Sequence, residues 1–371
     1  MKKPLSIYIH IPFCVSKCAY CDFLSAPASM DVWEQYLHML KREIKDKLIQ
    51  YKETHILYTM FIGGGTPSIV DANMLSEVVY EVLSYMEVRD EIEISIECNP
   101  GTVTREKLEM YRRAGINRIS IGLQSTQDQL LKKLGRIHTY EQFLHTYQTA
   151  REVGFENINI DLMSALPGQT LADYKRTLEE VLSLKPEHIS AYSLIVEEGT
   201  PFYDMELDLP DEDTERAMYE LTKSLLHDQG YERYEISNYA KSTYECKHNK
   251  VYWEGGDYLS FGIGGASYMA GMRFKNHSGL ERYLQGDFSV EDVQVLTSKE
   301  QAEEFFFLGL REMKGVDLEV FIHRFGQDML DQYQETIERF IKEGLLVHDK
   351  NLCLTDKGID VSNVIFLAFL D

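Results

Sequence analysis

The sequence contains no long hydrophobic run. Its two apolar stretches are Leu5–Phe13, which His10 and Pro12 interrupt, and Val364–Leu370, which has seven residues. Crossing a bilayer takes about 20 apolar residues, so neither stretch predicts a transmembrane helix. No small-residue cleavage site follows Leu5–Phe13, which argues against a signal peptide. We therefore expect a soluble, cytoplasmic protein that is not an integral membrane protein.

Basic residues are scarce. The chain has 38 Lys and Arg against 60 Asp and Glu, which gives a formal net charge of −22 at pH 7. Such an acidic surface disfavours nucleic acid and anionic membranes as partners. The chain also lacks long linkers and low-complexity segments, and its 44% hydrophobic and 26% charged residues are typical of globular proteins. Its 371 residues are enough for two to three domains, or for one large barrel with an appendage.

Cysteine is also infrequent, and a chain of this length builds a core without disulfides. Cys14, Cys18 and Cys21 nevertheless lie within eight residues, in a Cys-x3-Cys-x2-Cys spacing. The three isolated cysteines are Cys98, Cys246 and Cys353. A zinc site with His10 as fourth ligand, a redox pair of Cys18 and Cys21, or simple buried thiols are the alternatives. The spacing favours iron–sulfur ligation.

Three thiolates leave one iron of a [4Fe–4S] cluster without a protein ligand. The amino and carboxylate groups of S-adenosylmethionine can chelate this open iron. An electron that passes from the cluster to the sulfonium then releases a 5′-deoxyadenosyl radical. The triplet therefore predicts a cluster held by Cys14, Cys18 and Cys21, with S-adenosylmethionine as a second cofactor.

The first half of the chain alternates short β-rich segments with room for one helix each. The six segments are Ser6–Ile11, Leu57–Ile62, Ile92–Cys98, Asn117–Leu123, Asn157–Met163 and His188–Leu194. Between them, Thr139 and Gln142 predict the capping box of a helix that ends at Gly154. This order predicts parallel strands joined by right-handed crossovers, in a partial barrel or an open doubly wound sheet.

In either fold the chemistry gathers at the carboxyl ends of the strands. The cysteine triplet follows the first segment, and Gly63–Pro67 follows the second. Glycines let a ligand approach the backbone closely. A phosphate loop is one alternative, but no Lys-Ser or Lys-Thr follows at Walker spacing, and a tight turn without a ligand is another. The polar residues near the ends of the other four segments are Glu97, Gln124, Asp161 and Tyr192.

The pattern loosens between about residues 195 and 290, where glycine and tyrosine are frequent. The tail from Ser298 predicts three helices, two short β segments at Leu345–His348 and Leu352–Leu354, and a final helix. Its excess of acidic residues argues against DNA reading. We expect a barrel over 1–200, an irregular α/β extension over 201–290, and a small, mainly helical, winged-helix-like C-terminal domain over 291–371.

Four further motifs carry a family resemblance: Tyr8–Cys14, Phe61–Pro67, Ile121–Gln124 and Asn159–Gly168. Together with the triplet they resemble the radical SAM superfamily and, more narrowly, the oxygen-independent coproporphyrinogen III oxidase family. The resemblance implies an α/β fold with a partial (β/α)6 TIM-like barrel. It also implies eight residues that contact S-adenosylmethionine. These are Tyr8, Gly64, Gly65, Thr66, Glu97, Gln124, Arg136 and Asp161.

The side chains of this set suit the role that the resemblance implies. Glu97 and Asp161 can accept hydrogen bonds from an ammonium group or from ribose hydroxyls, and Gln124 can both donate and accept. Arg136 can bind a carboxylate. Each also has a purely structural alternative: Arg136 could form a surface salt bridge, and Asp161 could cap the loop that follows it.

Two departures set the chain apart from the oxidases of this family. The oxidases carry a further cysteine two residues after the triplet, where this chain has Phe23. They also have a longer arm before the cluster, whereas here only 13 residues precede Cys14. Both departures argue against decarboxylation of coproporphyrinogen.

The segment His248-Asn249-x-x-Tyr252-Trp253 resembles a motif of the HemW-like haem chaperone branch. Imidazole is a common axial ligand of haem iron, so the resemblance makes His248 a candidate haem ligand, with the Cys246 thiolate as an alternative. The other interpretation is structural: His248 and Asn249 hydrogen-bond a loop, and the two aromatic residues fill the core beneath it.

The resemblance thus favours a haem chaperone, which binds haem, delivers it to acceptor proteins, and carries a [4Fe–4S] cluster and S-adenosylmethionine. Such a protein is not itself an enzyme. The alternatives are oxidative decarboxylation of coproporphyrinogen III to protoporphyrinogen IX, or a radical SAM reaction on another porphyrin. A redox-active protein would also need an electron donor as a partner.

Overall fold

The computed structural model describes residues 2–370, and its first half alternates parallel strands with helices. The strands are β1 (Lys3–Ile11), β2 (His55–Gly64), β3 (Val88–Cys98), β4 (Arg118–Gln124), β5 (Asn157–Ser164) and β6 (His188–Ser193). The helices are α1 (Met30–Leu48), α2 (Ala72–Tyr85), α3 (Arg105–Arg113), α4 (Asp128–Lys133), α5 (Tyr140–Glu152) and α6 (Leu171–Ser183), with the 3-10 helix η1 (Pro67–Ile69) after β2. All six strands overlap the segments predicted from the sequence.

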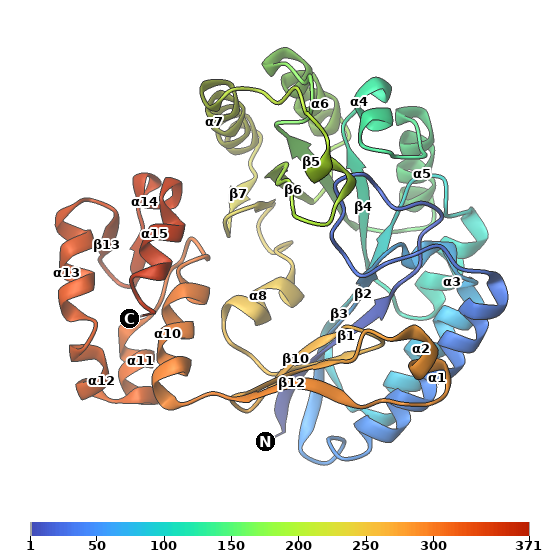
Figure 1. The fold of residues 1–371 in the computed structure, drawn as a ribbon, viewed down its shortest axis with the longest axis horizontal. Coiled ribbons are helices and arrows are strands. Elements are labelled where there is room, and N and C mark those ends of the chain that lie inside the picture. Colours follow the sequence, from blue (N-terminus) through green and yellow to red (C-terminus); the bar gives the residue numbers. More distant parts are fainter. Residues whose placement is uncertain (1, 371) are drawn as a thin grey trace.

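The strands β1 to β6 pair in sequence order, and each is parallel to the next. Within the described residues this order has no reversal of the kind that marks a doubly wound sheet. The helices lie on the outer side of the curved sheet (Figure 1). The partial (β/α)6 barrel is therefore confirmed, and the doubly wound alternative is wrong.

The local sequence explains these elements. Every residue of β4 is buried, as expected for a strand covered on both faces. On α1, Leu37 and Ile44 belong to an apolar stripe and are fully buried against the sheet. Thr139 and Gln142 form the predicted capping box of α5, and Gly154, with a φ of 96°, follows its end.

The region 201–290 extends the same sheet at both edges. Strand β9 pairs with β1 at one edge, and β8 pairs with β6 at the other. The elements are η2 (Pro201–Asp204), α7 (Glu212–Asp228), β7 (Glu232–Arg233), β8 (Asn238–Ala240), α8 (Lys247–Trp253), β9 (Tyr258–Phe261), β10 (Ala266–Met269), β11 (Met272–Asn276), α9 (Leu280–Leu284) and β12 (Val290–Val295). These strands have two to six residues each, too few for a hydrophobic period to be visible in the sequence.

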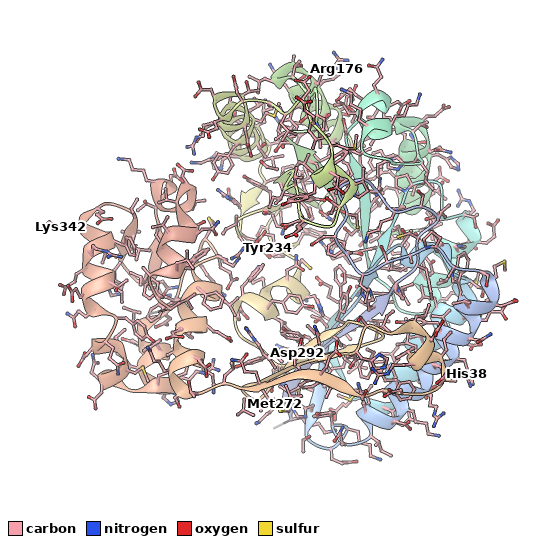
Figure 2. The ribbon with its side chains drawn as sticks, viewed as in Figure 1. His38, Arg176, Tyr234, Met272, Asp292 and Lys342 are labelled. Atoms are coloured by element: carbon pink, nitrogen blue, oxygen red, sulfur yellow. The ribbon has the colours of Figure 1, made fainter. Side chains whose placement is uncertain are left out.

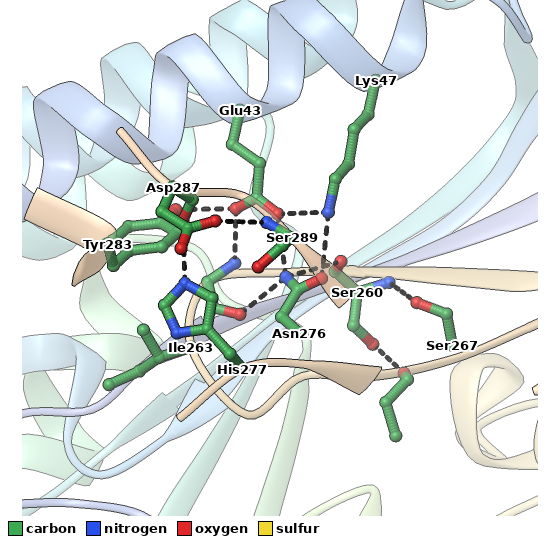
Figure 3. Close-up of polar contacts among 12 residues, drawn as sticks. Glu43, Lys47, Ser260, Ile263, Ser267, Asn276, His277, Tyr283, Asp287 and Ser289 are labelled. Carbon is green, nitrogen blue, oxygen red and sulfur yellow. Dashed lines mark hydrogen bonds and ion pairs between the residues drawn. The ribbon is translucent and has the colours of Figure 1, made fainter. Parts of the chain in front are cut away.

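A buried carboxylate joins α1 to this extension. The Glu43 side chain on α1 is fully buried and forms an ion pair with Lys47 at 2.7 Å. It also accepts hydrogen bonds from the Gly262 backbone N–H at 2.8 Å, the Asn276 Nδ2 at 2.8 Å and the Tyr283 hydroxyl at 2.7 Å (Figure 3). A buried charge is tolerated when its partners satisfy it as fully as this.

Replacing Glu43 by alanine should destabilise the protein by about 3–5 kcal/mol, because it leaves several buried donors and one ammonium group without an acceptor. Urea unfolding would measure the change. Glu34→Ala, at an exposed acid on the same helix, is the matched control and should change stability by less than about 0.5 kcal/mol. Equal effects of the two substitutions would show that the Glu43 network does not stabilise the fold.

The C-terminal region has a hydrophobic core of its own, which begins at Ala302. Stacked and edge-on rings fill it, with the Phe306 and Phe369 centroids 4.5 Å apart. Its elements are α10 (Ser298–Gly309), α11 (Leu318–Phe325), α12 (Gln327–Asp331), α13 (Gln334–Lys342), β13 (Leu346–His348), β14 (Leu352–Leu354), α14 (Asp356–Asp360) and α15 (Ser362–Leu367). The predicted order of helices, β hairpin and final helix is confirmed, with additional short helices.

None of the helices within residues 2–370 is both long enough and apolar enough to cross a membrane.

Candidate functional site

One pocket lies at the carboxyl ends of the barrel strands, and it gathers most of the residues singled out in the sequence. The three cysteines and seven of the eight residues implied for S-adenosylmethionine line it together. The set is Cys14, Cys18, Cys21, Gly64, Gly65, Thr66, Glu97, Gln124, Arg136 and Asp161. Because these residues are up to 147 positions apart in the chain, the fold alone brings them together.

The cysteines lie on the loop between β1 and α1. Backbone bonds shape this loop: the Cys21 N–H donates to the Cys18 carbonyl at 3.2 Å, and the Cys14 N–H donates to the Ala26 carbonyl at 3.2 Å. None of the three is in a disulfide. The Cys14 sulfur is 3.5 Å from the Thr66 hydroxyl, so this cysteine faces the loop that follows β2.

The thiols suit a cluster better than a single ion. Among residues 2–370, no three His, Cys, Asp or Glu side chains are grouped closely enough to hold one metal ion. Cysteines that hold a [4Fe–4S] cluster each bind a different iron, which spaces their sulfurs more widely than ligands of one ion. The fourth zinc ligand considered above, His10, is committed elsewhere: its Nε2 donates to the Leu24 carbonyl at 2.9 Å and its Nδ1 accepts from the Tyr8 hydroxyl at 3.1 Å.

Gly64, the last residue of β2, and Gly65 after it are required by packing within the chain. A Cβ on Gly65 would lie 2.5 Å from the Phe13 carbonyl oxygen, and one on Gly64 would lie 2.6 Å from the His10 ring. Gly64 also has a φ of 113°, which favours glycine. The bare backbone therefore lets this loop dock on the cysteine loop, through the Thr66 N–H, which donates to the Phe13 carbonyl at 2.7 Å.

Two partly buried carboxyl groups, Glu97 and Asp161, line the pocket. Burial, and then the nearby Asp161, raise the pKa of Glu97 to about 8, while the Gly64 N–H donates to its Oε2 at 3.0 Å. Burial also raises the pKa of Asp161, although Asn159 donates to it at 2.7 Å and Ser120 at 3.1 Å, which opposes that rise. A cationic group bound here would ionise both carboxyl groups.

Arg136 is partly buried against the cysteine loop. Its Nη2 donates to Asn99 Oδ1 at 2.8 Å and to the Gly122 carbonyl, and its Nη1 lies 3.8 Å from the Cys18 sulfur. The Nε of Arg136 is buried without a hydrogen-bond partner among residues 2–370. The surface salt-bridge alternative for Arg136 is therefore wrong, and the unpartnered donor fits an anionic ligand group.

Gln124 and Tyr192 meet at the far wall. Gln124 ends β4 with a φ of 70°, an uncommon backbone conformation for a residue with a side chain. The Tyr192 hydroxyl donates to its Oε1 at 3.2 Å and so orients the amide.

One of the eight residues implied for S-adenosylmethionine lies elsewhere, and the sequence missed other residues of the pocket. Tyr8 does not line the pocket, and its ring stacks on Phe61 with the two centroids 6.2 Å apart. Burial, and then the nearby Glu97, raise the pKa of its phenol. Tyr20 and Asn99 were missed, although Asn99 directly follows the third predicted strand and Tyr20 lies within the cysteine triplet. Asn99 donates to the Thr66 hydroxyl at 2.8 Å and thereby joins it to Arg136.

His248 lies outside this pocket, on α8 under the barrel. Its Nδ1 is 2.8 Å from the Thr59 hydroxyl, its Nε2 is 2.8 Å from the Tyr252 hydroxyl, and its ring stacks on Phe61. Iron ligation by His248 would require one of these two hydrogen bonds to break. Burial raises the pKa of the alternative ligand, the Cys246 thiol, to about 12.

Buried polar side chains attach α8 to the barrel. The Glu93 carboxylate on β3 accepts from the backbone N–H groups of Lys247 at 3.0 Å and His248 at 3.2 Å. Tyr234, labelled in Figure 2, donates to His188 Nε2 at 2.9 Å and accepts from the Cys246 N–H at 3.3 Å. The motif that begins at His248 thus builds the floor of the barrel.

Comparison with known proteins matches both parts of this fold. Residues 8–181 match the model of the radical SAM superfamily, and residues 296–361 match that of the HemN C-terminal domain. The coproporphyrinogen III oxidase HemN of Escherichia coli, described as a radical SAM enzyme, has a TM-score of 0.87 at 23% identity, with 99% of this chain and 90% of that one covered. At that identity the likeness shows the fold alone.

Relatives in sequence are named Heme chaperone HemW. The protein from Lactococcus lactis subsp. lactis is 37% identical, with 100% of this chain and 98% of the relative covered. The one from Bacillus subtilis is 36% identical, with 98% and 99% covered. A mitochondrial radical S-adenosyl methionine domain-containing protein 1 from Danio rerio is 30% identical, with 84% and 73% covered. The chain therefore belongs to the HemW family within the radical SAM superfamily.

Proposed function

We propose that this chain is a haem chaperone, which binds haem and delivers it to acceptor proteins, and that it carries a [4Fe–4S] cluster and S-adenosylmethionine. The observation that carries the proposal is the similarity to HemW proteins over the whole chain. Phe23 supports it, because this side chain lines the pocket and is 63% exposed where the oxidases carry a further cysteine.

The pocket supports both cofactors. Cys14, Cys18 and Cys21 would hold three irons and leave the fourth open to the amino and carboxylate groups of S-adenosylmethionine. With both groups bound, the site can supply one-electron cleavage of the sulfonium. The unpartnered Nε of Arg136 is placed to bind the carboxylate, and Gln124, held by Tyr192, to orient the ligand.

The two carboxyl groups prepare the pocket for a positive charge. At neutral pH Glu97 is largely protonated, because its pKa is about 8. Arrival of the methionine ammonium would favour the carboxylate and release the proton to solvent. Asp161 keeps its orientation through Asn159 and Ser120, so it can accept from the ligand without moving.

Gln124→Ala and Asp161→Asn should each weaken S-adenosylmethionine binding about tenfold or more, since each removes a hydrogen bond to a charged or polar ligand group. Iron content should stay unchanged, because neither residue is a cluster ligand. Equilibrium dialysis together with iron analysis would measure both quantities. Glu179→Gln, at an exposed acid on α6, is the control. A parallel loss of iron and of binding would instead make both residues structural supports.

Oxidative decarboxylation of coproporphyrinogen III is the second candidate function, and a radical reaction on another porphyrin is a third. The structural likeness to HemN shows a shared fold, which is compatible with the second candidate. For any of these reactions the chain would also need an electron donor as a partner.

The proposal is tested by adding haemin to the cluster-loaded protein without oxygen. A haem carrier should bind one equivalent, with a defined Soret band, and should release it to apomyoglobin added as a scavenger. Absence of saturable binding would contradict the proposal. So would haem that excess apomyoglobin does not remove, because a carrier must give up its cargo.

A further inference from the structure

A second cavity lies between α8, the extension strands and the C-terminal helices, away from the cluster pocket. Its volume is about 350 Å³, within the range of small-molecule sites. The end of α8, strand β10, helices α10 and α11 and the loop between these two helices line it. Figure 1 shows α8 beside α10. No residue of the cluster pocket lines this cavity.

Flat and apolar side chains form its walls. Trp253 and Tyr268 come from the barrel side, and Phe305, Leu308 and Val320 come from the C-terminal side. Val320 is 52% exposed at the surface of α11. The Nε1 of Trp253 is buried without a hydrogen-bond partner among residues 2–370. A flat apolar ligand with a hydrogen-bonding edge would cover these walls and satisfy that donor.

The carboxylates in the cavity are already paired. Lys314 forms ion pairs with Glu254 at 2.5 Å and with Glu312 at 3.2 Å. Arg273 pairs with Glu304 at 2.8 Å. Two cations therefore offset part of the negative charge of these three acids, and Lys314 is not available for a ligand.

Arg324 is the cation of this cavity that forms no ion pair with a carboxylate among residues 2–370. The other carboxylate, Asp317, caps α11 by accepting from the backbone N–H groups of Glu319 at 2.8 Å and Val320 at 3.3 Å. Arg324, on the same helix, makes no ion pair among residues 2–370, and its guanidinium lies beside the Tyr268 phenol. An exposed guanidinium beside an apolar cavity fits a ligand with a carboxylate at its outer edge.

Tyr268 places a phenol in the same cavity. Its side chain is 6% exposed and lines the barrel wall on β10. Burial raises the pKa of its phenol, and the adjacent Arg324 guanidinium opposes that rise. A phenolate is an established axial ligand of ferric haem, and a neighbouring cation favours it.

We propose that this cavity binds haem: the ring packs between Trp253 and Phe305, the Tyr268 phenolate binds the ferric iron, and Arg324 pairs with a propionate. The proposal rests on the proposed haem chaperone function and adds its site. Binding forms one oxygen–iron bond, breaks the phenol O–H bond and releases the proton to solvent, with no change in oxidation state. The motif on α8 then serves haem through Trp253, while His248 and Tyr252 fix the helix to the barrel.

The test is a haemin titration of the cluster-loaded wild type and its variants. Tyr268→Phe keeps the ring and should shift the Soret band and raise the Kd at least about tenfold. Val320→Trp fills the cavity from an exposed position and should raise the Kd similarly, and it covers the case in which Tyr268→Phe fails to fold. Tyr258→Phe, at a ring stacked 6.3 Å from Tyr268 but outside the cavity, is the matched control and should behave as wild type.

The outcomes distinguish failure of the proposed haem site from failure of the proposed chaperone function. A wild type that binds no haem contradicts the chaperone function itself. A wild type that binds haem, with unchanged spectra and Kd in folded Tyr268→Phe and in Val320→Trp, overturns the site but leaves the function. A spectral shift in His248→Ala with none in Tyr268→Phe would likewise overturn the proposed site. It would identify His248 on α8 as the axial ligand of the iron.

Discussion

Cys18→Ala is expected to abolish the iron–sulfur chromophore, as are Cys14→Ala and Cys21→Ala. Three thiolates from one loop leave no spare ligand, so loss of one uncouples the cluster from the protein. Anaerobic reconstitution followed by absorbance, iron and sulfide analysis would measure the effect. The expected iron content of each variant is close to that of an unreconstituted sample.

Cys98 offers a demanding control for this result. It lines the same pocket, yet burial raises the pKa of its thiol well above the ordinary value, which disfavours the thiolate that a metal needs. Cys98→Ala and Cys353→Ala should therefore keep the full iron content. An intact cluster in Cys18→Ala, or a lost one in Cys98→Ala, would contradict the assigned ligand set.

Gly65→Ala should remove most of the cluster without touching a ligand. The added methyl group would lie 2.5 Å from the Phe13 carbonyl oxygen, so the cysteine loop and the loop after β2 could no longer dock. Overpacking of this kind costs about 1–3 kcal/mol and should lower the reconstituted iron content severalfold. Iron analysis and urea unfolding of the same preparation would measure both effects.

Gly154→Ala separates the loss of the contact between the two loops from a general loss of stability. Gly154 has a φ of 96° but open space around its Cβ position, so alanine there costs about 1–2 kcal/mol of backbone strain. This variant should lose stability and keep its cluster. Equal loss of iron in both variants would mean that general destabilisation, and not the contact between the two loops, explains Gly65→Ala.

Much of the barrel was predictable because its signals are local. The residues of β4 are all buried and include Ile119, Ile121 and Leu123, and Thr139 with Gln142 marks the start of α5 within four positions. The cluster pocket followed from topology, since the carboxyl ends of parallel strands meet at one edge. Glu97, Gln124 and Asp161 could therefore be placed together before their contacts were known.

Other features depend on partners far away in the sequence. Glu43 looks like a solvent-facing acid on an amphipathic helix, but its partners Gly262, Asn276 and Tyr283 are more than 200 positions away. The glycines at and after the end of β2 suggested space for a ligand, whereas Gly65 makes room for the backbone of Phe13. The spacing of residues along the chain predicts neither the contacts of Glu43 nor the close approach of Gly65 to Phe13.

The haem motif shows the limit of reasoning from residue type. An imidazole in a haem-related chain predicts an iron ligand, yet His248 is held between Thr59 and Tyr252. The last residue of the same motif, Trp253, faces a cavity that the C-terminal domain completes. The packing of that domain against α8 distinguishes His248, which is held inside the barrel, from Trp253, which lines the cavity.

The most direct test of the chaperone account is an anaerobic assay of the cluster-loaded protein with coproporphyrinogen III, S-adenosylmethionine and a reductant. Chromatography of the oxidised porphyrins would count the decarboxylated product, and the same preparation would be titrated with haemin. The account predicts one equivalent of bound haem and no protoporphyrinogen IX above a sample without protein. Multiple turnovers of coproporphyrinogen III would contradict it and establish the oxidase function instead.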